Sequence, residues 1–145
     1  MNPRLLLFVP ALALSACATK APPASDATAA PAPANASPWE AAKARGTAFR
    51  GIGTEPGWMV EVGSGQSPAL HAELDYGERK LDVARMQALS GILGYAGTTG
   101  DGVEVKLHLQ RGDCSDGMSD DTYPVAARLI VGGKAYAGCG RFLQE

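Results

Sequence analysis

The residues best suited to chemistry gather in one stretch of the C-terminal third. It holds four carboxylates within nine residues, together with a cysteine and a tyrosine: Asp113, Cys114, Asp116, Asp120, Asp121 and Tyr123. Clustered carboxylates can bind calcium, but the EF-hand order of alternating ligands and a late Glu is absent. Ser and Asp side chains also bond their own backbone in compact loops, in which Gly117 would supply an unusual dihedral. We favour the compact loop and expect no metal or other cofactor, with an irregular calcium site as the alternative.

An enzyme would need a nucleophile and a base placed together. Ser115 and Ser119 lie in the acidic stretch, whereas His71 and His108 occupy the middle of alternating, strand-like segments. No Gly-x-Ser-x-Gly elbow is present. A glycosidase-like pair among the 15 acidic residues stays open as an alternative. We predict a protein without catalytic residues.

The chain has three cysteines, Cys17, Cys114 and Cys139. If the first is modified, the other two form a natural pair in an oxidising compartment, and closing that loop would contribute roughly 3 kcal/mol. A zinc site is the rival hypothesis. It lacks partners, because neither histidine stands at metal-ligand spacing from these cysteines. We predict a Cys114–Cys139 disulfide.

Residues 1–16 have the plan of a secretory signal. Arg4 supplies a positive start, and the apolar run that follows is too short to span a bilayer. The run ends Leu14-Ser-Ala-Cys17, which resembles the bacterial lipobox, in which the cysteine is acylated and becomes the first residue of the mature protein. An ordinary cleaved signal with an incidental cysteine is the alternative. With Ala18 next and no retention aspartate, we expect lipid anchoring through Cys17 at the periplasmic face of the outer membrane.

Residues 17–38 are predicted to be the lipidated cysteine and a disordered linker. Ala18 to Pro38 contains nine Ala and five Pro in 21 residues, too few bulky apolar side chains to offset the entropy of ordering. One or two helical turns are expected over Trp39–Arg45, with Ser37 as the cap and Pro38 at the first helical position. Residues 39–145 form the predicted domain.

From residue 46 onward apolar residues recur with period two, as in strands with one solvated face. The clearest run alternates Val103, Val105, Leu107 and Leu109 with polar residues, and Gly132-Gly133 provides a two-residue hairpin turn. Residues 86–94 are compatible with a short helix or an irregular crossover. The sequence therefore predicts an all-β fold, a small antiparallel barrel of seven or eight short strands with one disulfide.

A second group of unusual residues occupies the turn Gly53-Thr-Glu-Pro-Gly-Trp58. One interpretation is structural, with a type II turn at Pro56-Gly57 and Trp58 entering the core. The other makes Glu55 and Trp58 the rim of a ligand site. We carry both residues as candidate contacts beside the acidic stretch.

Four motifs resemble those of a family of uncharacterised bacterial envelope lipoproteins: Gly53-Thr-Glu-Pro-Gly-Trp58, Cys114-Ser-Asp-Gly-Met-Ser-Asp120, Tyr123-Pro124 and Gly138-Cys139-Gly-Arg141. The resemblance covers roughly residues 46–142. It implies location and domain type, since the family supplies no catalytic residue. In its overall organisation only, the chain is similar to the membrane-bound inhibitors of c-type lysozyme. These are also small β-barrels with a disulfide, preceded by a lipobox.

These observations favour a lipid-anchored, non-catalytic binding protein whose contact surface includes Glu55, Trp58, Asp113, Asp116, Asp120, Asp121 and Tyr123. An inhibitor of a cell-wall hydrolase such as lysozyme, or a structural envelope component, are the alternatives. Without Arg4 the chain has 12 basic and 15 acidic side chains, about −3 in formal charge, so nucleic acid is not an expected partner. We expect a monomer that contacts the membrane through its lipid and binds a periplasmic protein or a cell-wall ligand.

Overall fold

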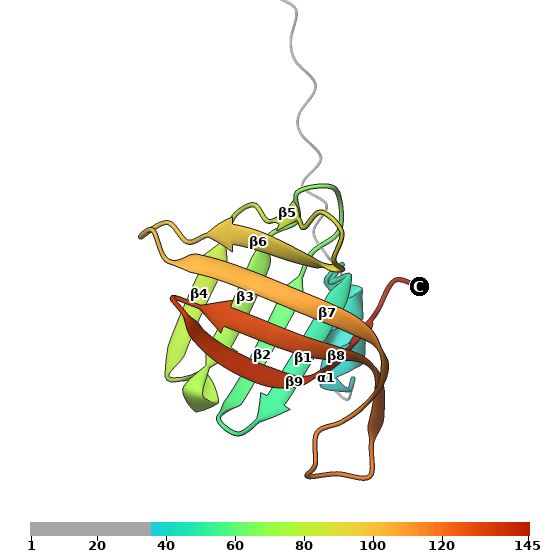
Figure 1. Cartoon of the computed structure of the whole chain (residues 1–145). Helices are drawn as coiled ribbons and strands as arrows, with labels where there is room; N and C mark the ends of the chain where they lie inside the picture. Colours follow the sequence, from blue (N-terminus) through green and yellow to red (C-terminus); the bar gives the residue numbers. More distant parts are fainter. Residues whose placement is uncertain (1–35) are drawn as a thin grey trace, which may run out of the picture.

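The computed structural model describes residues 36–145 (Figure 1). One short helix precedes nine strands, and a single 3-10 turn lies between the third and fourth. In chain order the elements are α1 (Pro38–Ala44), β1 (Phe49–Thr54), β2 (Gly57–Val62), β3 (Leu70–Leu74), η1 (Asp75–Gly77), β4 (Arg79–Val83), β5 (Gln87–Ala88), β6 (Gly94–Thr98), β7 (Glu104–Ser115), β8 (Thr122–Val131) and β9 (Lys134–Phe142).

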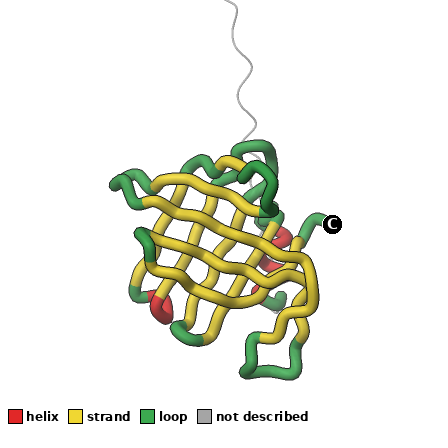
Figure 2. Tube along the Cα trace, in the orientation of Figure 1, coloured by secondary structure: helices red, strands yellow, loops and turns green. Residues whose placement is uncertain are grey.

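All nine strands belong to one antiparallel sheet in the order β4-β3-β2-β1-β9-β8-β7-β6-β5. The sheet curls on itself, so that β6 to β9 cross in front of β1 to β4 (Figures 1 and 2). It forms a half-barrel, with β4 and β5 at its two ends. The predicted all-β antiparallel fold with one disulfide is confirmed.

The core fills the concave side of the sheet. Along β7, Val105, Leu107 and Leu109 are buried, while Lys106 and His108 are half-buried on the other side. The same alternation runs through β1, β2, β3 and β8. Each fully buried Val or Leu contributes about 1.5–3 kcal/mol through removal of its apolar surface from water. We call the convex side, which carries Lys106 and His108, the outer face.

Of two turns predicted from their glycines, one is confirmed and one is wrong. Gly132 and Gly133 both have positive φ and join β8 to β9 in the predicted two-residue hairpin. The predicted type II turn at Pro56-Gly57 is wrong. The Glu55–Pro56 peptide bond is cis, and Gly57 is already the first residue of β2.

Residues 86–94 adopt the irregular alternative instead of a helix. Met86 is buried and its N–H donates to the carbonyl of Pro68 at 2.7 Å. The two-residue strand β5 follows, then a loop that leaves the side chains of Ile92 and Leu93 exposed. This segment carries the chain from β4, at one end of the sheet, to the other end.

Helix α1 begins as predicted. Ser37 caps it by accepting a hydrogen bond from the N–H of Glu40 at 3.2 Å, and the Glu40 carboxylate accepts from the N–H of Ser37 at 2.9 Å. This reciprocal pair satisfies two amides that the first helical turn would otherwise leave unbonded. The Ser37 amide also lowers the pKa of the Glu40 carboxyl.

The expected signal, the acylation site Cys17 and most of the expected linker lie outside the described residues. Within residues 36–145, no helix is both long and apolar enough to cross a membrane.

Candidate functional site

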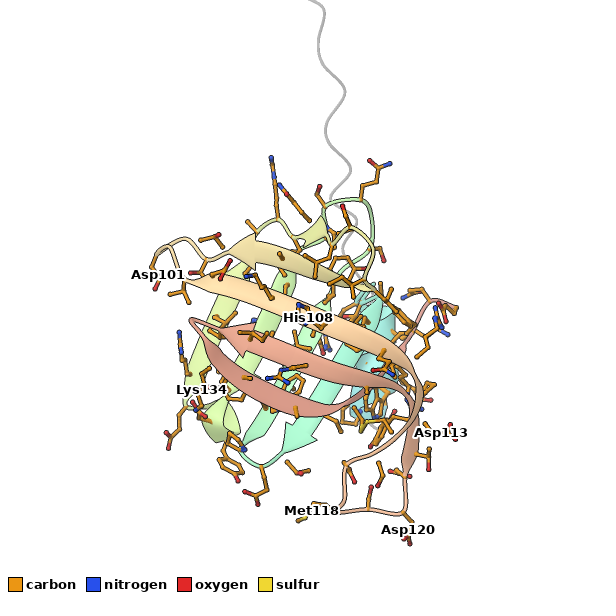
Figure 3. The ribbon with its side chains drawn as sticks, viewed as in Figure 1. Asp101, His108, Asp113, Met118, Asp120 and Lys134 are labelled. Carbon is orange, nitrogen blue, oxygen red and sulfur yellow. A yellow bond between two sulfur atoms is a disulfide. The ribbon has the colours of Figure 1, made fainter. Side chains whose placement is uncertain are left out.

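The acidic stretch forms a hairpin that extends beyond the rest of the sheet at the lower right of Figures 1 and 3. We call residues 112–124 the arm. It consists of the end of β7, a loop and the start of β8. The β7–β8 register shifts between Arg111 and Cys114, and Gly112 at φ 146° lies in this irregular step. A bulge of this kind bends a strand, and here it coincides with the point where the arm leaves the sheet.

A disulfide fixes the foot of the arm. Cys114 and Cys139 are joined with an S–S distance of 2.05 Å and a Cα–Cα distance of 5.7 Å, which confirms the predicted pair and excludes the zinc alternative for these two sulfurs. The bond connects β7 to β9 past the intervening strand β8. Gly138 and Gly140 flank Cys139 because a Cβ at either position would overlap the backbone of β1.

The tip of the arm is organised by Asp116. Its Oδ1 accepts from the N–H groups of Met118 and Ser119, each at 3.0 Å, and from the Ser119 hydroxyl at 3.1 Å. Gly117 has φ 73°, as a compact loop requires. The two amides lower the pKa of the Asp116 carboxyl, because they stabilise its charged form. The predicted self-bonded loop is confirmed at this residue.

A second tie joins the tip to the β1–β2 turn. The Thr54 hydroxyl donates to the carbonyl of Asp116 at 3.3 Å. Between the arm and the strand ends lies a cleft of about 260 Å³, which the disulfide and the backbone of Gly53 and Gly138 help to line. The arm is therefore held at its foot by a covalent bond and near its tip by a hydrogen bond.

The other carboxylates of the arm face solvent. Asp113, Asp120 and Asp121 are exposed, as is Met118 at 73% of its maximal surface (Figure 3). Within residues 36–145, no basic side chain forms an ion pair with any of the four arm carboxylates. The arm thus presents uncompensated negative charge around one exposed thioether.

Two of the candidate contact residues are buried and need correction. Trp58 is 4% exposed, and its Nε1–H donates to the carbonyl of Ala137 at 3.0 Å, so it belongs to the core as the structural interpretation predicted. Tyr123 is also 4% exposed. Both are large rings at the ends of strands, where packing against neighbouring elements offers more apolar contact than solvent does. Glu55 is exposed on its turn, with Oε2 3.4 Å from the Tyr76 hydroxyl.

Tyr123 anchors the arm to α1 and to β9. Its ring centroid lies 5.6 Å from that of Trp39 on α1, and the guanidinium carbon of Arg141 lies 5.2 Å from Tyr123 and 4.7 Å from Trp39. Burial raises the pKa of the Tyr123 hydroxyl, with the charges of Asp116 and Asp121 adding to the effect. Arg50 on β1 also approaches the Trp39 ring, at 5.6 Å. We call Trp39, Arg50, Tyr123 and Arg141 the arginine–aromatic cluster.

Sequence reasoning missed this cluster. Its members come from α1, β1, β8 and β9, and only the register Arg50↔Arg141 places the two arginines directly opposite each other. The sequence offered only one sign of the cluster, the presence of Arg50 and Arg141 in two strand-like segments far apart in the chain.

Neither a metal site nor a catalytic pair emerges among the described residues. Residues 36–145 contain no group of three or more His, Cys, Asp or Glu placed to hold a metal ion. His71 Nδ1 lies 2.7 Å from Asp82, and the Ser119 hydroxyl bonds Asp116, so neither serine of the arm is hydrogen-bonded to a histidine in this part of the chain. The absence of catalytic activity stays a prediction.

Comparison with known proteins gave no match to a family model, to a curated protein or to a solved structure.

Proposed function

We propose that this chain is a lipid-anchored, non-catalytic binding protein that recognises a basic protein surface through the arm. The proposal rests on one observation: the arm holds exposed carboxylates that form no ion pair within residues 36–145, and its position is fixed by the disulfide. A partner would meet Asp113, Asp120 and Asp121 already held on a hairpin that a disulfide ties to β9. Such pre-organisation lowers the entropic cost of association, and the negative charge steers a basic partner toward the arm.

Inhibition of a cell-wall hydrolase is a sharper form of the same proposal. An inhibitor of this kind would place a protruding acidic loop in the cleft of a basic enzyme. The arm meets the geometric part of that requirement, because its tip extends past the sheet (Figure 3). A c-type lysozyme is therefore a suitable first probe.

A purely structural role would be favoured if Asp116, Asp120 and Trp58 were all buried and bonded locally. Trp58 is buried and bonded, and the Asp116 carboxylate is engaged by its own loop. Asp120 is exposed, and its carboxylate forms no ion pair within residues 36–145. The arm thus has a part that supports its shape and a part that is left available for a partner.

The experiment is capture of periplasmic proteins, with lysozyme as a purified probe, by the full-length protein in non-ionic detergent. The test variant replaces Asp113, Asp116, Asp120 and Asp121 with Asn. The matched control neutralises four acids elsewhere, Glu78, Asp82, Asp101 and Glu104. We expect capture of a basic protein that weakens with salt, is lost in the test variant and is retained in the control. Equal loss in both variants, or no capture, would contradict the proposal.

The anchoring part of the proposal has its own test. Replacing Cys17 with Ser should release the protein from the membrane fraction, because the acyl chains would supply its hold on the bilayer. Continued sedimentation with membranes would show that Cys17 is not the anchor.

A further inference from the structure

The arginine–aromatic cluster lies in a region of surplus positive charge on the outer face. Glu61 on β2, Arg50 on β1 and Arg141 on β9 stand directly opposite one another across three adjacent strands. Arg45 reaches the same carboxylate, with Nη2 2.8 Å from Glu61 Oε1, and Arg50 Nη1 is also bonded to it. Two guanidinium groups therefore share one carboxylate, and the third, that of Arg141, is not bonded to it.

Arg141 is the guanidinium left without an anion. Its side chain forms no ion pair within residues 36–145, and its Nε is fully buried without a hydrogen-bond partner. Arg50 Nε is in the same condition, although Arg50 Nη1 bonds Glu61. Arg141 as a whole is only half-buried, so part of its side chain remains in contact with solvent.

The two rings hold Arg141 in place without neutralising it. The distances of 4.7, 5.2 and 5.6 Å among the guanidinium carbon, Trp39 and Tyr123 describe a triangle. The cation therefore lies over both rings on one side of a packed pair and is not enclosed between two separated rings. A cation–π contact stabilises the charged form but offers no hydrogen-bond acceptor. The planar fork remains free to bind an oxyanion with two parallel hydrogen bonds.

We propose that Arg141, with Arg50 beside it, binds a phosphate-type oxyanion on the outer face next to α1. Two sources share this chemistry: free phosphate, and the phosphodiester of a lipid headgroup. The position of the site suits the second source, because α1 is the first described element after the segment that would lead to the lipid on Cys17. The carboxylates of Asp116 and Asp121 lie near enough to Tyr123 to raise the pKa of its hydroxyl, so their negative charge opposes the binding of an anion at Arg141.

The test is an NMR titration of the full chain in non-ionic detergent, following the Nε–H signals of Arg50 and Arg141. The probes are inorganic phosphate and glycerophosphoglycerol, the soluble diester headgroup of phosphatidylglycerol, each compared with sodium chloride at equal ionic strength. We expect saturable shifts of both signals with at least one phosphate probe and none with chloride. A stronger effect of the diester identifies the lipid headgroup as the source, and a stronger effect of inorganic phosphate identifies the free ion.

Variants separate binding from packing. Arg141→Gln should weaken binding about tenfold or more, as loss of a charge-assisted hydrogen bond predicts. Arg141→Lys should weaken it less, because the charge is kept and only the fork is lost. Arg128→Gln, an exposed arginine on β8, should leave it unchanged. Asp121→Asn should strengthen it by removing a nearby negative charge.

The wild-type titration decides the proposal even if an Arg141 variant fails to fold. Shifts that chloride reproduces, or no shift with either phosphate probe, would overturn the site and leave the cluster as a packing device for α1.

Discussion

The arm and the arginine–aromatic cluster adjoin each other but carry opposite charge and are built in different ways. The carboxylates of the arm come from one run of nine residues, and the Asp116 bonds that shape its tip are made within four residues. The cluster assembles side chains from one helix and three strands that are up to about a hundred residues apart. A local loop can be inferred from its composition, whereas a surface assembled across strands depends on register.

Their connection is Tyr123, which belongs to both. Across the β7–β8 pair it stands opposite Cys114, the cysteine that ties the arm to β9, and on its other side it packs against Trp39. A change at the foot of the arm should therefore reach α1, while a change at the tip should not. The predictions below test this difference, beginning with the largest expected effect.

Loss of the disulfide should have the largest effect. Cys114→Ser should lower the free energy of unfolding by about 3 kcal/mol, because the loop that the bond closes gains freedom mainly in the unfolded chain. Urea denaturation with and without reductant measures this loss. Cys114→Ser and Cys139→Ser should be equivalent, and the double variant no worse than either. Unchanged stability of the wild type under reducing conditions would contradict the prediction.

Gly140→Ala should come next. The new Cβ would overlap the carbonyl of Arg50 and the ring of Phe49, so β1 and β9 must separate at the point that sets the register of the two arginines. Overpacking of this kind costs about 1–3 kcal/mol. Gly100→Ala is the matched control, since no other side chain or backbone lies within 4 Å of its Cβ position. Equal stabilities of the two variants would show that the close approach is unimportant.

Trp39→Ala should detach α1 from the foot of the arm. The helix has seven residues and is too short to persist alone, so loss of its ring contacts should remove the hydrogen-exchange protection of the Ala41 and Arg45 amides. We expect a loss of about 1–2 kcal/mol from the aromatic and cation–π contacts.

Ser37→Ala is the comparison for that variant. It removes the cap without touching the cluster and should cost about 1 kcal/mol. Trp39→Ala should alter the NMR signals of Tyr123, and Ser37→Ala should not. If both variants left Tyr123 unchanged, α1 would not be coupled to the arm.

Acid should loosen the tip of the arm with the smallest effect on the whole domain. The pKa of Asp116 is lowered in the folded protein, so its stabilising contribution is fully present above the ordinary carboxyl pKa and is lost as pH falls through the lowered value. Amide NMR signals of Met118 and Ser119 should therefore change at lower pH than the ordinary carboxyl range. Asp116→Asn should abolish this acid transition, and Asp120→Asn should leave it intact. A transition at the ordinary pKa would refute the assigned hydrogen bonds.

Much of the architecture was determined by the sequence, because the interactions responsible are local or periodic. Alternation with period two identified the main strands, Ser37 and Pro38 identified the start of α1, and Gly132-Gly133 identified the tightest hairpin. The pairing of Cys114 with Cys139 was predicted from the number of cysteines and an expected oxidising compartment, and Asp116 proved to bond its own loop. Each of these features can be predicted either from residues close together in the sequence or from a choice among few possible pairings.

The tertiary structure decided what depends on register and on competition for burial. Alternation does not encode which strands are neighbours, so the open order from β4 to β5 and the row Glu61, Arg50, Arg141 could not be derived from it. A tryptophan or tyrosine beside a turn can serve as a contact or as core. Trp58 is buried where the carbonyl of Ala137 accepts its Nε1–H. Tyr123 is buried where it packs against the ring of Trp39 and the guanidinium of Arg141.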